Sequence, residues 1–197
     1  MSTVQSTTTR PSTDVKEVVD AEVKEWHFHI YFLQNDAKAK QAALDLRAAV
    51  LRLRRDGAFI AVPLFRVNDG PMGPHPIGSY EIWCPMESFA SVYSYLALNR
   101  GDLSIFIHPL TRDEQLSSYL CQRADHQVRS AWMGPSFPLY LDVLPVRSED
   151  IPSQYPSLRL GYSSTWQGPS IEERKKAGAV VEHALRGEKE AARAPTD

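Results

Sequence analysis

The sequence predicts an α+β domain built on one antiparallel sheet, and three observations lead to this fold class. Residues 26–32, WHFHIYF, read as a strand whose side chains point alternately to two faces. Two segments, residues 36–57 and 85–101, carry apolar side chains at helical spacing, and each is followed by further short apolar runs. The resulting order, β-α-β-β-α-β, is the ferredoxin-like split βαβ pattern, for which the expected strand order is 4-1-3-2.

The first half of the domain contains a strand, a helix and a second strand. The first strand is expected within residues 24–33, after which Asn35 or Asp36 caps a helix that ends at Gly57. Residues 58–66, AFIAVPLFR, form the second strand. Because Pro63 has no N–H to donate, this strand is expected at an edge of the sheet, where the order 4-1-3-2 puts it.

The second half repeats the pattern and adds further elements. The third strand is expected at residues 79–84, the second helix begins at Pro85, and the fourth strand covers residues 103–109. A fifth strand is expected at residues 137–145, FPLYLDVLP, and a peripheral helix at residues 171–193. We therefore divide the chain into a disordered N-terminal tail (1–22), a ferredoxin-like domain (23–146) and a C-terminal extension (147–197).

Composition narrows the class of protein. The formal net charge of −2 offers no basic surface for nucleic acid, and no apolar stretch is long enough to span a bilayer. The polar N-terminus does not resemble a signal peptide, and two cysteines, Cys84 and Cys121, cannot build a disulfide framework. We expect a cytoplasmic protein without nucleic-acid or membrane partners, and a homodimer is plausible for such a sheet.

Five histidines are expected to gather on the helix-free face of the sheet. His27 and His29 share that face of the first strand, and His108 ends the neighbouring fourth strand. His75 lies in the loop before the third strand, and His126 follows the fourth strand. A single buried histidine is ordinarily a packing residue, but convergence of all five favours a metal site. Three ligands on one face would leave coordination positions open, which suits catalysis.

Several short motifs resemble one known family. WHFHIYF, GPHPIGSYEIW, LSIFIHPLT and DHQVRSAWMGPSFPLYLDVLP, in this order over residues 24–145, are similar to the DOPA 4,5-dioxygenase family of fungi and bacteria. The resemblance implies a ferredoxin-like domain that cleaves the ring of a catechol such as L-DOPA with O₂ in an extradiol reaction. It also implies non-haem Fe(II) as the cofactor, which zinc can replace in crystals.

The residues suggest a role for each member of the expected site. We expect His27, His29 and His108 to bind the metal, and His75 and His126 to act as acid–base groups or substrate anchors. We expect Asp125 to orient a histidine by bonding its ring nitrogen. Tyr31 and Trp132 are expected to pack against the aromatic ring of the substrate.

The third ligand and the activity itself have alternatives. Iron(II) oxygenases commonly use two histidines and one carboxylate, and Glu81 has the parity to face the histidine pair. Glu81 is therefore the alternative to His108. The alternative function is a module of the same fold that binds a metal or small molecule without turnover.

Overall fold

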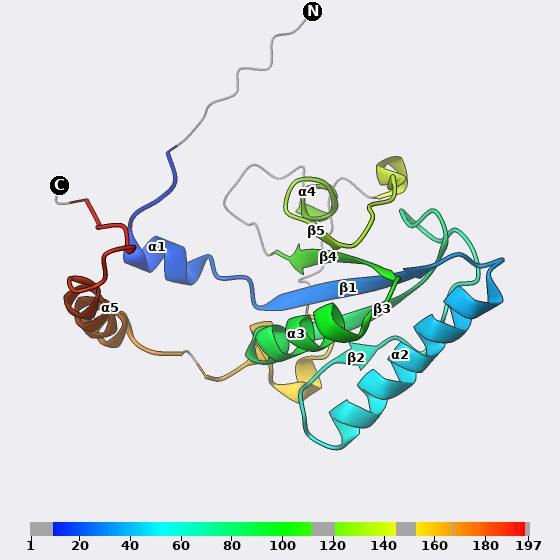
Figure 1. Cartoon of the computed structure of the whole chain (residues 1–197), viewed down its shortest axis with the longest axis horizontal. Coiled ribbons are helices and arrows are strands. Elements are labelled where there is room, and N and C mark those ends of the chain that lie inside the picture. Colours follow the sequence, from blue (N-terminus) through cyan, green and yellow to red (C-terminus); the bar gives the residue numbers. More distant parts are fainter. Residues whose placement is uncertain (1–9, 112–120, 145–152, 167, 196–197) are drawn as a thin grey trace, which may run out of the picture. The chain divides into compact units, whose positions relative to one another are not determined.

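Five strands form one open antiparallel sheet in the order β2-β3-β1-β4-β5 (Figure 1). The computed structural model describes residues 10–111, 121–144, 153–166 and 168–195, without the side chains of residues 121–123. The expected α+β class is confirmed. The strands are β1 (Glu25–Phe32), β2 (Val62–Pro63), β3 (Gly78–Pro85), β4 (Ser104–Leu110) and β5 (Ala131–Met133).

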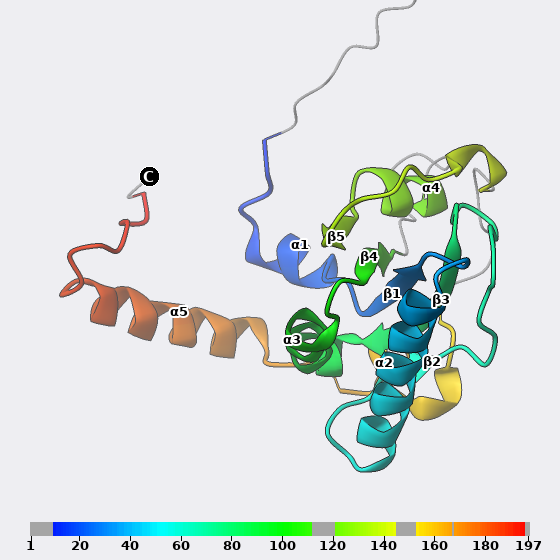
Figure 2. The same ribbon diagram turned by 45° about the vertical axis from the view of Figure 1, so that its right-hand side comes forward.

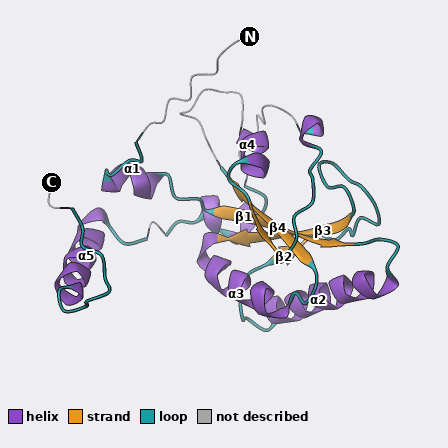
Figure 3. Cartoon of the chain, turned by 45° about the horizontal axis from the view of Figure 1, so that its top comes forward, coloured by secondary structure: helices purple, strands orange, loops and turns teal. Residues whose placement is uncertain are grey.

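One face of the sheet is covered by two helices, α2 (Ala37–Arg55) and α3 (Phe89–Asn99) (Figure 2 and Figure 3). Asp36 caps α2 by accepting hydrogen bonds from two backbone N–H groups of the first turn. Alternate β1 residues Phe28, Ile30 and Phe32 point into the core, where they meet apolar residues of both helices. The core members from the helices are Ala43, Leu46, Val50, Val92 and Leu96.

The opposite face of β1 carries polar and aromatic side chains. Glu25, His27, His29 and Tyr31 point there, because they alternate with the core residues. The short helix α4 (Cys121–Gln127) lies on this side of the sheet (Figure 3). This face of the sheet holds the candidate site.

The second strand is short and lies at the edge of the sheet. Of residues 58–66, over which the sequence predicts a strand, only Val62 and Pro63 form the ladder with β3, and an isolated bridge joins Asn68 to Ser79 farther along. Pro63 opposes Ile82, and its missing N–H costs no bond at an edge.

The predicted fifth strand at residues 137–145 is wrong. The fifth strand is instead Ala131–Met133, and the single-turn helix η2 (Leu141–Val143) lies where part of the strand was expected. Pro138 cannot donate to a ladder, and the Phe137 ring stacks on Tyr31 across the sheet face. The backbone N–H of Tyr140 donates to the carbonyl of Pro74 at 2.9 Å, so the segment pairs with a loop.

Contacts divide the chain into two units, residues 23–165 and residues 1–22 with 166–197. In the second unit, Asp14 caps helix α1 (Val15–Asp20), inside the tail expected to be disordered. Helix α5 (Ile171–Leu185) begins with a capping box between Ser170 and Glu173. Among the described residues, no helix combines the length and apolar character needed to cross a bilayer.

Residues 153–165, which we call the strap, belong to the same unit as the sheet although the sequence predicts a boundary at residue 146. The strap contains η3 (Pro156–Leu158) and η4 (Gly161–Ser163). Glu25, which is 0% exposed, accepts hydrogen bonds from the indole N–H of Trp83 at 2.8 Å and the backbone N–H of Tyr162 at 3.1 Å. Gly161 has φ +60°, and a Cβ there would lie 2.5 Å from Cγ of Glu25. A buried carboxylate thus anchors the strap to the start of β1.

Candidate active site

The register of the sheet brings the histidines of β1 and β4 together. His27 lies directly opposite His108, and His29 lies opposite Phe106 on β4 and Glu81 on β3. Directly opposed residues in an antiparallel pair point to the same face. These side chains therefore share the helix-free face, as the predicted parity of both strands requires.

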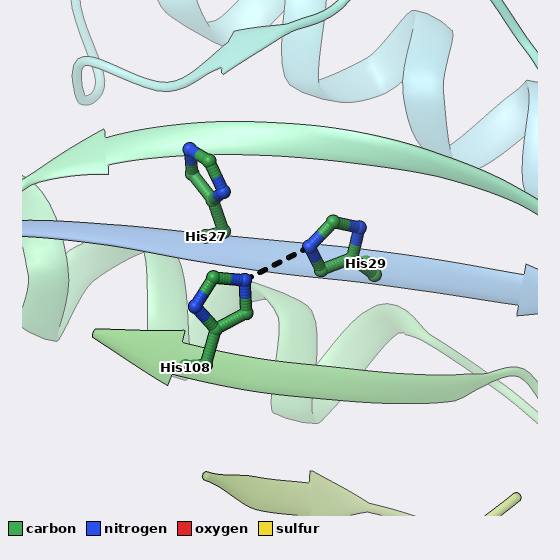
Figure 4. A group of neighbouring side chains, drawn as sticks. All are labelled: His27, His29 and His108. Atoms are coloured by element: carbon green, nitrogen blue, oxygen red, sulfur yellow. Dashed lines mark hydrogen bonds between the residues drawn. The ribbon is translucent and has the colours of Figure 1, made fainter. Parts of the chain in front are cut away.

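Three imidazoles form a group with the geometry of metal ligands. His27, His29 and His108 each offer a ring nitrogen, and these atoms all lie within 4.8 Å of one another (Figure 4). The Nε2 atoms of His29 and His108 are 3.1 Å apart. His29 and His108 are only 4% and 1% exposed, so the group is largely shielded from water.

A second group shares His29 with the first. His29, His75 and His126 also offer nitrogens within 4.8 Å of one another. The ring centroid of His75 lies 4.1 Å from that of His29, and the centroid of His126 lies 3.9 Å from that of His108. The structure thus brings together all five histidines that the sequence places on this face, and it adds an alternative ligand set.

Burial keeps His29, His75 and His108 neutral. Desolvation, followed by the neighbouring histidines, holds the pKa of His29 and of His108 well below its ordinary value. Desolvation and His126 lower the pKa of His75 to about 3. A neutral imidazole has one nitrogen lone pair, which is the form that binds a metal ion.

The hydrogen bond of His108 shows which nitrogen is free to bind. Nδ1 of His108 donates to the backbone carbonyl of Pro109 at 2.9 Å, because a carbonyl can only accept. The lone pair of neutral His108 is therefore on Nε2, the atom that faces His29. Metal-bound histidines usually donate their other N–H to such a carbonyl, so the donor set fits a divalent cation.

Tyr31 is positioned to hold His75. Its hydroxyl lies 2.6 Å from Nδ1 of His75, and the residue is 1% exposed. Burial raises the pKa of Tyr31, so the phenol keeps its proton. The ring lies between Trp132, with centroids 5.2 Å apart, and Phe137, with centroids 5.7 Å apart. The contact of Tyr31 and Trp132 with a substrate stays a prediction.

The two acidic residues singled out from the sequence have different surroundings. Oε1 of Glu81 lies 3.4 Å from Nε2 of His27, and Glu81 belongs to neither of the two ligand groups. The Asp125 carboxylate accepts hydrogen bonds from the backbone N–H of Thr111 at 3.0 Å and from Arg129 at 3.1 Å. Asp125 thereby ties α4 to the end of β4, and its role toward a ring nitrogen stays a prediction.

A pocket of about 220 Å³ lies beside the histidines, and its lining includes His29, His75 and Glu81. The remaining lining residues are Leu64, Arg66, Asn68, Met72, Gly73 and Pro74. The pocket therefore combines an apolar wall with one cationic and one anionic side chain. These features suit an aromatic ligand that also carries charged groups.

Sequence reasoning missed Gln154 and Arg66. The side-chain oxygen of Gln154 lies 2.8 Å from Nε2 of His27, and its amide nitrogen lies 3.1 Å from Oε1 of Glu81. Gln154 lies in a proline- and serine-rich segment without periodicity, and Arg66 ends the strand expected over residues 58–66 but lies in a loop of the structure. The one sequence feature that points to the strap is Glu25, a carboxylate at the start of a buried strand that needs donors from elsewhere.

Comparison with known proteins gives consistent matches. The model of the Dopa 4,5-dioxygenase family matches residues 26–143. A protein from Amanita muscaria named DOPA 4,5-dioxygenase is 65% identical over 187 residues, covering 95% of this chain and 78% of the relative. An uncharacterized 21.2 kDa protein from Botryotinia fuckeliana is 36% identical over 118 residues, which is 59% of this chain and 61% of that protein.

A solved structure is similar to part of the chain. The crystal structure of a candidate dioxygenase from Nostoc punctiforme superposes with a TM-score of 0.50 and 30% sequence identity. The match covers 61% of this chain and 90% of the other.

Proposed function

Because this chain belongs to the Dopa 4,5-dioxygenase family, we propose that it is a metal-dependent extradiol dioxygenase acting on a catechol such as L-DOPA. In the overall reaction, the ring bond between one hydroxylated carbon and its unhydroxylated neighbour breaks. Both atoms of O₂ enter the product, a muconic-semialdehyde-type compound, so the reaction needs no other oxidant or reductant. The printed name of the Amanita relative supports this activity.

The observation that carries the proposal is the cluster of histidines beside the pocket, of which His29, His75 and His108 are buried and neutral. We assign His27, His29 and His108 as the ligands, with Glu81 as the alternative third ligand. The expected metal is Fe(II), which when bound would supply the Lewis-acid and redox chemistry of ring cleavage. The carbonyl-bound Nδ1 of His108 supports the first ligand group over the second, His29 with His75 and His126.

The remaining histidines are suited to handling the catechol protons. His75 lines the pocket, and its Nδ1 is occupied by Tyr31, so Nε2 is the atom left for a substrate hydroxyl. His126 is packed against His108 and can exchange a proton from the α4 side. We propose Trp132 and Tyr31 as the aromatic surroundings of the substrate ring.

Arg66 gives the pocket a cation that a plain catechol would not need. A guanidinium pairs well with a carboxylate, and L-DOPA carries a carboxylate on its side chain. We therefore propose Arg66 as the group that favours an amino-acid catechol.

The same proposal extends to properties that follow from the family and the sequence. We propose that the domain is of the ferredoxin-like class, that the protein works in the cytoplasm, and that it forms a homodimer. Size-exclusion chromatography with light scattering tests the last of these.

The decisive experiment is anaerobic reconstitution with Fe(II) followed by L-DOPA and O₂. We expect a yellow ring-opened product, and loss of both iron and turnover in H27A, H29A and H108A. H75A should keep its iron but lose turnover. H183A, which changes an exposed histidine on α5, is the matched control and should keep both.

Two results would contradict the proposal in different ways. Iron-loaded protein that opens neither L-DOPA, dopamine nor caffeic acid would favour a module that binds a metal or small molecule without turnover. Full iron content in H108A, with loss in H126A, would move the metal to the second histidine group.

A further inference from the structure

Three polar side chains form a row at the edge of the histidine cluster. The Gln154 carboxamide lies between Glu81, at 3.1 Å from its Nε2 to Oε1, and His27, at 2.8 Å from its Oε1 to Nε2. Glu81 comes from β3, His27 from β1 and Gln154 from the strap. The row thus joins the strap to a proposed ligand.

The chemistry of this row fixes the direction of its hydrogen bonds. A carboxylate only accepts, so the NH₂ group of Gln154 faces Glu81 and its carbonyl oxygen faces His27. That carbonyl can only accept, so Nε2 of His27 carries the ring proton. In the neutral ring, the lone pair is then on Nδ1, and Figure 4 shows the second ring nitrogen of His27 on the side of His29 and His108.

The strap holds Gln154 in place independently of this row. The backbone N–H of Gln154 approaches Oε2 of Glu25 at 3.4 Å, and the hydroxyl of Tyr162 donates to the carbonyl of Leu110 at 2.6 Å. The backbone N–H of Gly161 donates to both carboxylate oxygens of Glu87, at 3.2 and 3.3 Å. These contacts tie the strap to the start of β1, to the end of β4 and to the turn before α3. The position of Gln154 therefore does not depend on its hydrogen bond to His27.

We propose that Gln154 is a positioning residue that holds His27 as an Nδ1 ligand. In this proposal the Glu81 carboxylate accepts the hydrogen bond that orients the Gln154 carboxamide. This inference rests on the proposed metal site. It assigns Glu81 a role outside the ligand set, because Oε1 is already an acceptor for Gln154 and lies beside the protonated nitrogen of His27. The third ligand is then His108.

The first test reads the tautomer of His27 without any metal. Long-range ¹H–¹⁵N spectra of the full chain labelled with ¹⁵N-histidine distinguish a ring protonated on Nε2 from one protonated on Nδ1. We expect His27, identified by its absence in H27A, to be protonated on Nε2. In Q154M, which keeps the length but removes both polar groups, this preference should be lost, whereas Q154E keeps an acceptor oxygen for Nε2 of His27 and should retain it.

The second test measures affinity for Zn(II) by competition with a chromophoric chelator. Q154M should bind about 10- to 100-fold more weakly, the usual effect of removing a partner of a ligand histidine, whereas Q154E keeps an acceptor for His27 and should bind more tightly than Q154M. E81Q, which keeps a carbonyl acceptor for the Gln154 amide, should retain most of the affinity. S153A is the matched control, because Ser153 bonds Ser163 within the strap and should leave both readouts unchanged.

The outcomes separate this inference from the proposed function. A His27 ring protonated on Nδ1, or a tautomer unchanged in Q154M, overturns the role of Gln154 even if the enzyme is active. Loss of Zn(II) binding in E81Q as severe as in H108A would make Glu81 a ligand and also overturn it. A wild-type chain that binds no metal contradicts the proposed function, while the tautomer still reports on Gln154.

Discussion

Replacing Glu25 with Gln tests whether a buried carboxylate holds the strap on the sheet. Glu25 is 0% exposed, with Oε2 bound to the indole N–H of Trp83 and Oε1 bound to the backbone N–H of Tyr162. A carboxamide has one acceptor, so in either orientation its NH₂ group faces one of these donors. One hydrogen bond is lost and one buried N–H stays unpaired. Such a group costs about 1–3 kcal/mol, and we expect the free energy of unfolding to fall by about 2 kcal/mol.

Urea unfolding followed by tryptophan fluorescence measures this change. The midpoint should fall in E25Q while the slope of the transition stays constant. E182Q, an exposed carboxylate on α5, is the control and should change stability by less than about 0.5 kcal/mol. An E25Q protein as stable as the wild type would refute the reasoning, because the donors of Trp83 and the strap would then not need the carboxylate.

The remaining predictions concern the site and the strap. H108A should lose at least about 10- to 100-fold in metal affinity, measured by the same Zn(II) competition, because removing a ligand weakens binding more than removing the hydrogen-bond partner of a ligand. Y31F should lower kcat about tenfold with unchanged iron content, because only the hydrogen bond to the pocket histidine is removed. R66Q should raise KM for L-DOPA about tenfold but leave dopamine, which has no carboxylate, unaffected; equal shifts for both would exclude this role. G161A should destabilise the protein by more than about 1 kcal/mol, and by more than G57A, whose added Cβ meets nothing within 4 Å; thermal denaturation compares the two.

The periodicity of the sequence determined most of the secondary structure. The alternation in β1 separates Phe28, Ile30 and Phe32 from the histidines, and the helical spacing of Ala43, Leu46 and Val50 marks the buried side of α2. These patterns are local consequences of burying one face, so they can be read without the fold. The prediction of a fifth strand at residues 137–145 failed because this apolar run has the composition of a strand. Only the structure shows that its Phe137 ring packs on Tyr31.

The part of the candidate site that lies on strands could be predicted from side-chain alternation and from the order of neighbouring strands. Residues two apart on a strand share a face, which groups His27 with His29, and the pairing of β1 with β4 brings in His108. His75 and His126 come from a loop and a short helix, whose paths no strand rule fixes. Their closeness to His29 is a property of the folded chain.

By itself, the sequence determined the first strand, the two helices that cover the sheet, their buried faces and the shared face of His27 and His29, because each depends on residues a few positions apart. Only the tertiary structure decided that Nδ1 of His108 donates to a backbone carbonyl, that the Gln154 amide binds the Glu81 carboxylate, and that Gln154 reaches His27 from 127 residues away. Those contacts depend on the docking of the strap on Glu25, which is a matter of long-range packing and hydrogen bonding that no local pattern encodes.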